Sequence, residues 1–165
     1  MTKSLFWIDQ LLRRLLIGLM AAIVLVVCWQ VVSRFVLGSP SSMTEEIART
    51  LLLWIGMLGA AWAYRTGQHL GLDILTSKLP AKAQHKMAIV LTSCVVLFAV
   101  SVLVVGGGAL VRLAFELDQM SAALGIGMGW IYLVLPLTGL LIAVYGYCQL
   151  LCLWRGKPLD CAESE

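Results

Sequence analysis

Four long apolar runs, separated by short polar stretches, dominate the pattern of this 165-residue chain. An α-helix rises about 1.5 Å per residue, so about 20 apolar residues cross a hydrocarbon layer of about 30 Å. The pattern therefore predicts an all-α integral membrane protein with four transmembrane helices. The predicted spans are residues 15–36, 46–65, 87–111 and 130–154. The short polar turn after the first span predicts that neighbouring spans run antiparallel.

The segments outside the spans complete the predicted organisation. Residues 1–14 combine an apolar face with basic residues, which is typical of an interfacial helix on the membrane surface. Residues 66–86 mix polar residues with single apolar ones and predict an amphipathic connector, whereas residues 156–165 form a polar tail. A cleaved signal peptide is the rival interpretation of the first run. That run exceeds the apolar core of about 7 to 15 residues of such peptides, so we expect a membrane domain over 15–155.

Composition and charge support the same class. The chain is 61% hydrophobic and 13% charged, whereas soluble domains are closer to half apolar and a quarter charged. Its net charge of +3 does not indicate nucleic-acid binding, because the basic residues stand at the ends of apolar runs. Of the twelve Lys and Arg residues, all but Arg34, Arg49 and Arg112 fall in the terminal segments or the connector with its flanking Arg65. The positive-inside rule then predicts cytoplasmic N- and C-termini.

The residues needed for catalysis or for a transport path are missing from the expected places. Both histidines, His69 and His85, lie on the connector, the cysteines form no C-x-x-C pair, and Gly106–Gly108 lacks the Lys and Ser/Thr of a phosphate loop. The middle of each predicted span has no ionisable residue, although a carrier needs a polar path there. We therefore expect no enzyme activity, no cofactor and no metal in this chain. A membrane scaffold or assembly factor is one alternative, and a small enzyme or a self-assembling pore is another.

The start of the second span carries charge. Glu45 and Glu46 stand four and three residues before Arg49, so both carboxylates can reach its guanidinium on a helix, with Thr44 as a candidate cap. Further along, small residues are spaced four apart, which lets two helix backbones approach closely in a bilayer. These pairs are Gly56 with Ala60 and Gly59 with Ala63. A partner helix is expected on this face, from this chain or from another.

Glycines also mark the third and fourth spans. Three in a row, Gly106–Gly108, weaken a helix and are tolerated at membrane depth only where another helix packs on them or the span ends. In the fourth span, Gly139, Ala143 and Gly146 lie on one side of the predicted helix.

Short motifs are distributed over nearly the whole chain. They are Ser33-Arg34-Phe35-Val36, Glu45-Glu46-Ile47-Ala48-Arg49, Trp54, Gly59-Ala60-Ala61, Arg65, His69, Asp73, Leu79-Pro80, Trp130, Tyr132 and Pro136-Leu137. Together they resemble the signature of the small membrane subunit of TRAP transporters, the DctQ-like family. The turn Leu37-Gly38-Ser39-Pro40 departs from the pattern, since an Asn and an aromatic residue are more usual there.

The resemblance implies a sodium-coupled, tripartite system of the bacterial inner membrane that takes up organic acids such as sialic acid or C4-dicarboxylates. A periplasmic binding protein captures the substrate, a large membrane subunit carries it with sodium, and the small subunit holds the large one. Sodium is then expected on the large subunit, and membrane lipids are the remaining partner. The expected interface with the large subunit consists of Arg34, Glu45, Glu46, Arg49, Trp54, Gly56, Gly59, Ala60, Ala63, Arg65, His69 and Asp73. Possible docking residues for the binding protein are Ser41, Ser42, Glu116 and Asp118.

Overall fold

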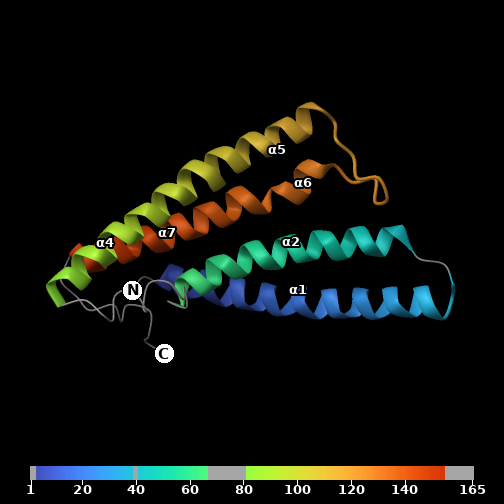
Figure 1. The fold of residues 1–165 in the computed structure, drawn as a ribbon, viewed down its shortest axis with the longest axis horizontal. Coiled ribbons are helices and arrows are strands. Elements are labelled where there is room, and N and C mark those ends of the chain that lie inside the picture. Colours follow the sequence, from blue (N-terminus) through green and yellow to red (C-terminus); the bar gives the residue numbers. More distant parts are fainter. Residues whose placement is uncertain (1–2, 39–40, 67–80, 155–165) are drawn as a thin grey trace. The chain divides into compact units, whose positions relative to one another are not determined.

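The computed structural model describes residues 3–38, 41–66 and 81–154, with side chains from residue 7 in the first range and from residue 85 in the last (Figure 1). The regular elements in this part of the chain are all helices. They are α1 (Lys3–Phe35), α2 (Ser42–Arg65), α4 (Ala81–Phe98), the π-helix η1 (Ala99–Gly106), α5 (Gly107–Glu116), α6 (Met128–Tyr132) and α7 (Val134–Trp154). Four helical segments are long and apolar enough to cross a membrane: Trp7–Phe35, Ser42–Arg65, His85–Glu116 and Met128–Trp154. The predicted all-α class with four membrane-spanning helices is therefore confirmed.

Several helices extend beyond the predicted spans. Helix α1 runs without a break past residue 14, so the predicted interfacial helix and the first span form one continuous helix. Helix α2 begins at Ser42 instead of residue 46. Thr44 therefore lies inside its first turn, where its hydroxyl donates to the Ser41 carbonyl at 2.9 Å and caps nothing. Residues 67–80, most of the predicted connector, and the tail 156–165 lie outside the described residues.

The third span reaches Glu116, five residues past its predicted end at 111. An ion pair between residues one helical turn apart supports this extra turn: Arg112 Nε lies 2.6 Å from Glu116 Oε1. The loop predicted to begin at Arg112 therefore begins at Leu117. The fourth span is also broken near its start, since α6 and α7 are separated at Leu133. Pro136 is the third residue of α7, where its missing N–H is not needed for the helix.

A π-helix of eight residues, η1, lies inside the third span. The Gly107 N–H that closes it donates to the carbonyl of Val102, five residues earlier, as well as to that of Val104. A Cβ placed on Gly107 would lie 2.9 Å from Leu135 Cβ and 3.2 Å from Pro136 Cδ. The glycine triplet is thus tolerated because the start of α7 packs directly on its middle residue.

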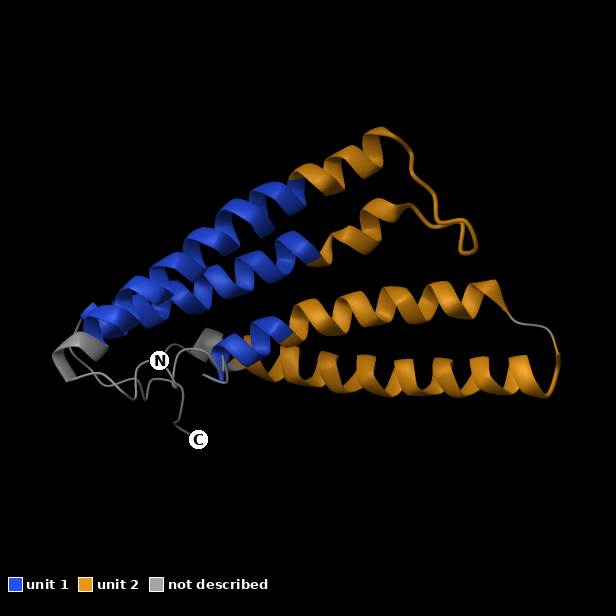
Figure 2. Cartoon of the chain, viewed as in Figure 1, with its two compact units in different colours: residues 1, 60–108, 135–165 blue, residues 2–59, 109–134 orange. Residues whose placement is uncertain are grey.

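Residue contacts group the chain into two compact units (Figure 2). Unit 1 consists of residues 1, 60–108 and 135–165, and unit 2 consists of residues 2–59 and 109–134. Unit 1 thus holds the end of α2, α4, η1 and α7, whereas unit 2 holds α1, most of α2, most of α5 and α6. Unit 1 contains a close helix seam, whereas unit 2 contains an anchored loop and most of an exposed face of α2.

Candidate interaction surfaces

In unit 1, α7 packs closely on its neighbours through two glycines. A Cβ on Gly139 would lie 2.7 Å from Leu103 Cβ and 2.9 Å from Val104 Cγ2, both on η1. A Cβ on Gly146 would lie 3.0 Å from the Tyr64 hydroxyl and would overlap Val96 Cγ2 of α4. The two glycines are seven residues apart and share one helix face. We call this face the α7 seam. The glycines of the fourth span therefore lie in a close helix contact.

A polar pair lies beside the α7 seam. Tyr64 and Thr92 carry hydroxyl groups, and both residues are buried. One residue on, the Arg65 guanidinium carbon lies 5.7 Å from the centroid of the Tyr145 ring, a cation–π distance. Arg65, expected to face the partner subunit together with His69 and Asp73, is therefore half-buried within unit 1. His69 and Asp73 lie outside the described residues.

The glycines of α2 have a different environment. In the described chain, no atom lies within 4 Å of a Cβ built on Gly56 or on Gly59. Exposed residues recur three or four apart along this helix, which places them on one stripe. The stripe consists of Glu45, Arg49, Leu52, Gly56 and Ala60, and we call it the open face of α2. Gly59, Ala63 and Trp54, also expected at the interface, are half-buried, whereas Arg34 on α1 is exposed.

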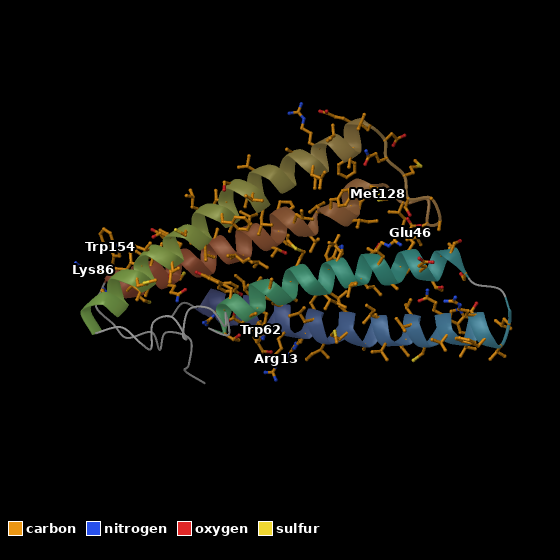
Figure 3. The ribbon with its side chains drawn as sticks, viewed as in Figure 1. Arg13, Glu46, Trp62, Lys86, Met128 and Trp154 are labelled. Carbon is orange, nitrogen blue, oxygen red and sulfur yellow. The ribbon has the colours of Figure 1, made fainter. Side chains whose placement is uncertain are left out.

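The two acidic residues at the start of α2 have different partners. Glu45 Oε1 lies 3.5 Å from Arg49 Nη2, and the two side chains are 64% and 79% exposed, so this ion pair is solvent-accessible. Glu46 instead accepts a hydrogen bond at 2.8 Å from the backbone N–H of Ala123, and the Ser121 hydroxyl bonds the same carboxylate. Figure 3 labels Glu46 on α2 and Met128 at the end of the loop that contains these donors.

The loop anchored by Glu46 spans residues 117–127 and has an ordered backbone. It begins where α5 ends: Asp118 has φ +45°, and the N–H of Gln119 reaches back to the carbonyl of Ala114 at 3.1 Å. These features form a Schellman-type helix end, in which asparagine, aspartate or glycine takes the left-handed conformation. Further on, the N–H of Ser121 donates to the Ile126 carbonyl at 2.9 Å. The backbone alone therefore closes the loop on itself.

Aromatic packing holds the two ends of this loop together. The rings of Phe115, before the loop, and Trp130, after it, meet edge to face with centroids 5.9 Å apart. A Cβ on Gly129 would lie 2.6 Å from Phe115 Cε2, so a glycine is needed where the ring packs. Edge-to-face pairs of this kind favour a defined geometry. The loop thus projects from a packed base.

The four predicted docking residues are all in unit 2. Glu116 is occupied by its ion pair with Arg112, and Asp118 ends α5 in a left-handed conformation. Ser42 is exposed at the start of α2, and Ser41 is half-buried before it. The structure gives no distance that brings the serines and the acids into one site. In the described residues no group of three or more His, Cys, Asp or Glu is arranged to hold a metal ion.

Comparison with known sequences decides the family. The family described as tripartite ATP-independent periplasmic transporters, DctQ component, matches residues 23–156. The chain belongs to this family. It is the small permease subunit of a TRAP transporter, as the motifs from Arg34 to Pro136 indicated. Its described spans make it a multi-pass inner-membrane protein.

Individual relatives agree with this assignment. The sialic acid TRAP transporter small permease protein SiaQ of Vibrio cholerae is 31% identical over 74% of this chain and 69% of its own length. A protein of Haemophilus influenzae assigned as a TRAP transporter small permease protein is 28% identical over 87% of this chain and 88% of its own. The sialic acid TRAP transporter permease protein SiaT of H. influenzae is 30% identical over 68% of this chain but only 18% of its own length. All three are transport proteins and none is named as an enzyme.

Proposed function

We propose that this small permease subunit carries no substrate itself and holds the large membrane subunit of a sodium-coupled TRAP transporter. The observation that carries the proposal is the open face of α2. Its Gly56 has no neighbouring atom of the described chain within 4 Å, although glycines at such spacing allow close helix contact in a bilayer. A helix of the large subunit is the natural occupant of this face.

The apolar middle of the spans supports a holding role. A carrier needs polar or ionisable groups inside the membrane to bind its substrate and coupling ion. The uncharged stretches of the four spans offer essentially hydroxyl groups there, such as Thr92 and Thr138, and both of these are buried. Sodium and substrate would then bind the large subunit. The match to a fifth or less of the length of SiaT also supports a stable association with a larger permease.

The topology follows from the charge distribution. We propose antiparallel spans with both termini and residues 66–86 on the cytoplasmic side, because nine of the twelve basic residues fall there when the flanking Arg65 is included. The loop 117–127 and the turn before Ser42 then face the periplasm. A periplasmic binding protein would dock on that side, with Ser41, Ser42, Glu116 and Asp118 among the candidate contacts. The first residues of α1 would lie at the inner membrane surface.

The substrate class rests on the names of relatives. SiaQ and SiaT are named for sialic acid, and a relative of Rhodobacter capsulatus that is 26% identical is a C4-dicarboxylate small permease. We propose an organic acid of one of these two classes, with sialic acid favoured because the SiaQ match covers more of this chain, 74% against 56%.

Purification of the native complex tests the proposal. An affinity tag on this chain alone should co-purify one large membrane subunit. After reconstitution, the pair should take up labelled sialic acid or a C4-dicarboxylate only with a sodium gradient and the matching binding protein. The control is the large subunit reconstituted without this chain, which should be inactive or poorly assembled. Equal uptake by the large subunit alone would contradict the holding role.

A further inference from the structure

The tip of the 117–127 loop is organised around one carboxylate. Glu46, in the first turns of α2, accepts the Ala123 N–H at 2.8 Å and also the hydroxyl of Ser121, which is 3% exposed. The N–H of Leu124 donates to the same Ser121 hydroxyl at 3.3 Å. Hydrogen bonds to an ionised acceptor are about twice as strong as neutral ones. The Ala123 N–H is therefore tied directly to a side chain 77 residues away, and the Leu124 N–H is tied to it through Ser121.

The backbone hydrogen bonds of the loop close its base and its tip, but they do not link the loop to α2. The backbone of Gln119 and Met128 closes the base, with the Met128 N–H donating to the Gln119 carbonyl at 2.7 Å. The Gly125 N–H, at φ +63°, then closes the tip on the Ser121 carbonyl at 3.0 Å. These bonds set the shape of the loop. The Glu46 contact adds what they lack, a link from the tip to the start of α2.

Comparison with the neighbouring Glu45 shows that, of the two adjacent glutamates, only Glu46 has a described hydrogen bond to the loop. Glu45 has the same charge and stands in the same turn of α2, yet it is exposed and pairs with Arg49. Glu45→Ala therefore supplies a matched control: it removes the same charge from the same helix turn, and none of the bonds described for Glu45 reaches the loop.

We propose that Glu46 is a positioning residue: it holds the loop tip against α2 and so fixes the surface that the loop presents to a docking protein. That surface has two exposed apolar side chains, Met120 at 62% and Ile126 at 48%, in the same loop as the exposed Asp118. It fits a protein partner with an apolar patch beside a basic side chain. The inference rests on the proposed docking of a binding protein at this side of the membrane.

Amide hydrogen exchange of the full chain tests the anchor without any partner. Glu46→Ala should speed exchange of the Ala123 amide about tenfold or more, because a charge-assisted hydrogen bond is lost. Glu46→Gln keeps an acceptor oxygen and should restore part of the protection, and Glu45→Ala should leave it unchanged. Peptides from α4 serve as the internal reference for global folding. Exchange in Glu46→Ala equal to the wild type would overturn the proposal.

A double variant tests whether Ser121 acts through the same anchor. Two residues of one hydrogen-bonded network give non-additive effects. Ser121→Ala should therefore raise exchange at Ala123 in the wild type but add little in Glu46→Ala. Additive effects would mean that the two residues hold the loop independently, which contradicts a single anchor at Glu46.

Uptake by the reconstituted complex then tests positioning. In Glu46→Ala the binding-protein concentration for half-maximal uptake should rise severalfold while the maximal rate stays at the wild-type level. Glu46→Gln, which keeps an acceptor oxygen, should restore part of that shift. Faster loop exchange with an unchanged uptake curve would overturn the positioning role. Failure of the proposed function gives a different result from failure of the positioning role. If the proposed function were wrong, uptake by the wild-type complex would not depend on a binding protein.

Discussion

Helices α2 and α7 both carry small residues at helical spacing, and the structure uses them differently. On α7, Gly139 and Gly146 meet atoms of neighbouring helices at distances that leave no room for a side chain. On α2, Gly56 and Gly59 meet no atom of the described chain within 4 Å. The same sequence signal thus marks an occupied seam in one helix and an unoccupied face in another.

The difference assigns different tasks to the two helices. Packing of small residues is a main source of helix association in lipid, where apolar side chains gain little by leaving hydrocarbon for protein. The α7 seam therefore stabilises the small subunit itself. The open face of α2 contributes nothing comparable within the described chain, so its contribution is expected in the complex.

The largest effect should come from filling the α7 seam. In Gly146→Leu the new side chain would overlap Val96 and the Tyr64 hydroxyl, and overpacking of this kind costs about 1 to 3 kcal/mol. The thermal midpoint of the purified small subunit should fall clearly. Gly56→Leu is the control and should stay within about 0.5 kcal/mol of the wild type. Equal losses in both variants would erase the distinction between the two helices.

A smaller effect is expected from the polar pair beside the seam. Tyr64→Phe removes one buried hydroxyl, and polar side chains that hydrogen-bond between membrane helices contribute about 0.6 kcal/mol on average, with a maximum of about 1.7. Thermal unfolding of the small subunit should report a modest loss. Tyr147→Phe, at a tyrosine that is 61% exposed, is the matched control and should show none. An equal loss of stability in Tyr147→Phe would show that the loss in Tyr64→Phe does not arise from the buried position of its hydroxyl.

The smallest effect on the isolated subunit is expected at Arg49. Its exposed ion pair with Glu45 should contribute less than about 1 kcal/mol. Arg49→Ala should nevertheless lower the yield of assembled complex, because Arg49 lies on the open face of α2. Arg112→Ala breaks a similarly exposed pair with Glu116 away from that face and is the control. Equal complex yields for both variants would remove Arg49 from the interface.

Much of this fold could be predicted because each span has its own signal within one continuous segment of the sequence. Apolar length alone identifies the four spans, and the glycine triplet Gly106–Gly108 indicates a place where another helix packs or the span ends. The extent of the helices is less accessible. The ion pair of Arg112 and Glu116 supports the extra turn of α5. Helix α1 continues through the point where the sequence changes from amphipathic to apolar, although that change of pattern suggests two separate helices.

The features that sequence reasoning missed depend on tertiary contacts. Glu46 and Arg49 have the spacing of an ion pair, but the carboxylate of Glu46 binds a backbone amide of the distant Ala123, and a backbone donor leaves no residue signature. The π-helix η1 follows from backbone hydrogen bonds within a run of valines, which apolar periodicity does not distinguish from an α-helix. Likewise, no pattern marks Asp118 as the residue that ends α5.

The central claim is that the open face of α2 receives the large subunit, and one measurement tests it most directly. The tagged small subunit carrying Gly56→Leu is purified from cells that express the large subunit, and the co-purified large subunit is quantified. The account predicts a strong loss of the large subunit while the variant alone keeps the wild-type thermal midpoint. A wild-type amount of bound large subunit would contradict it.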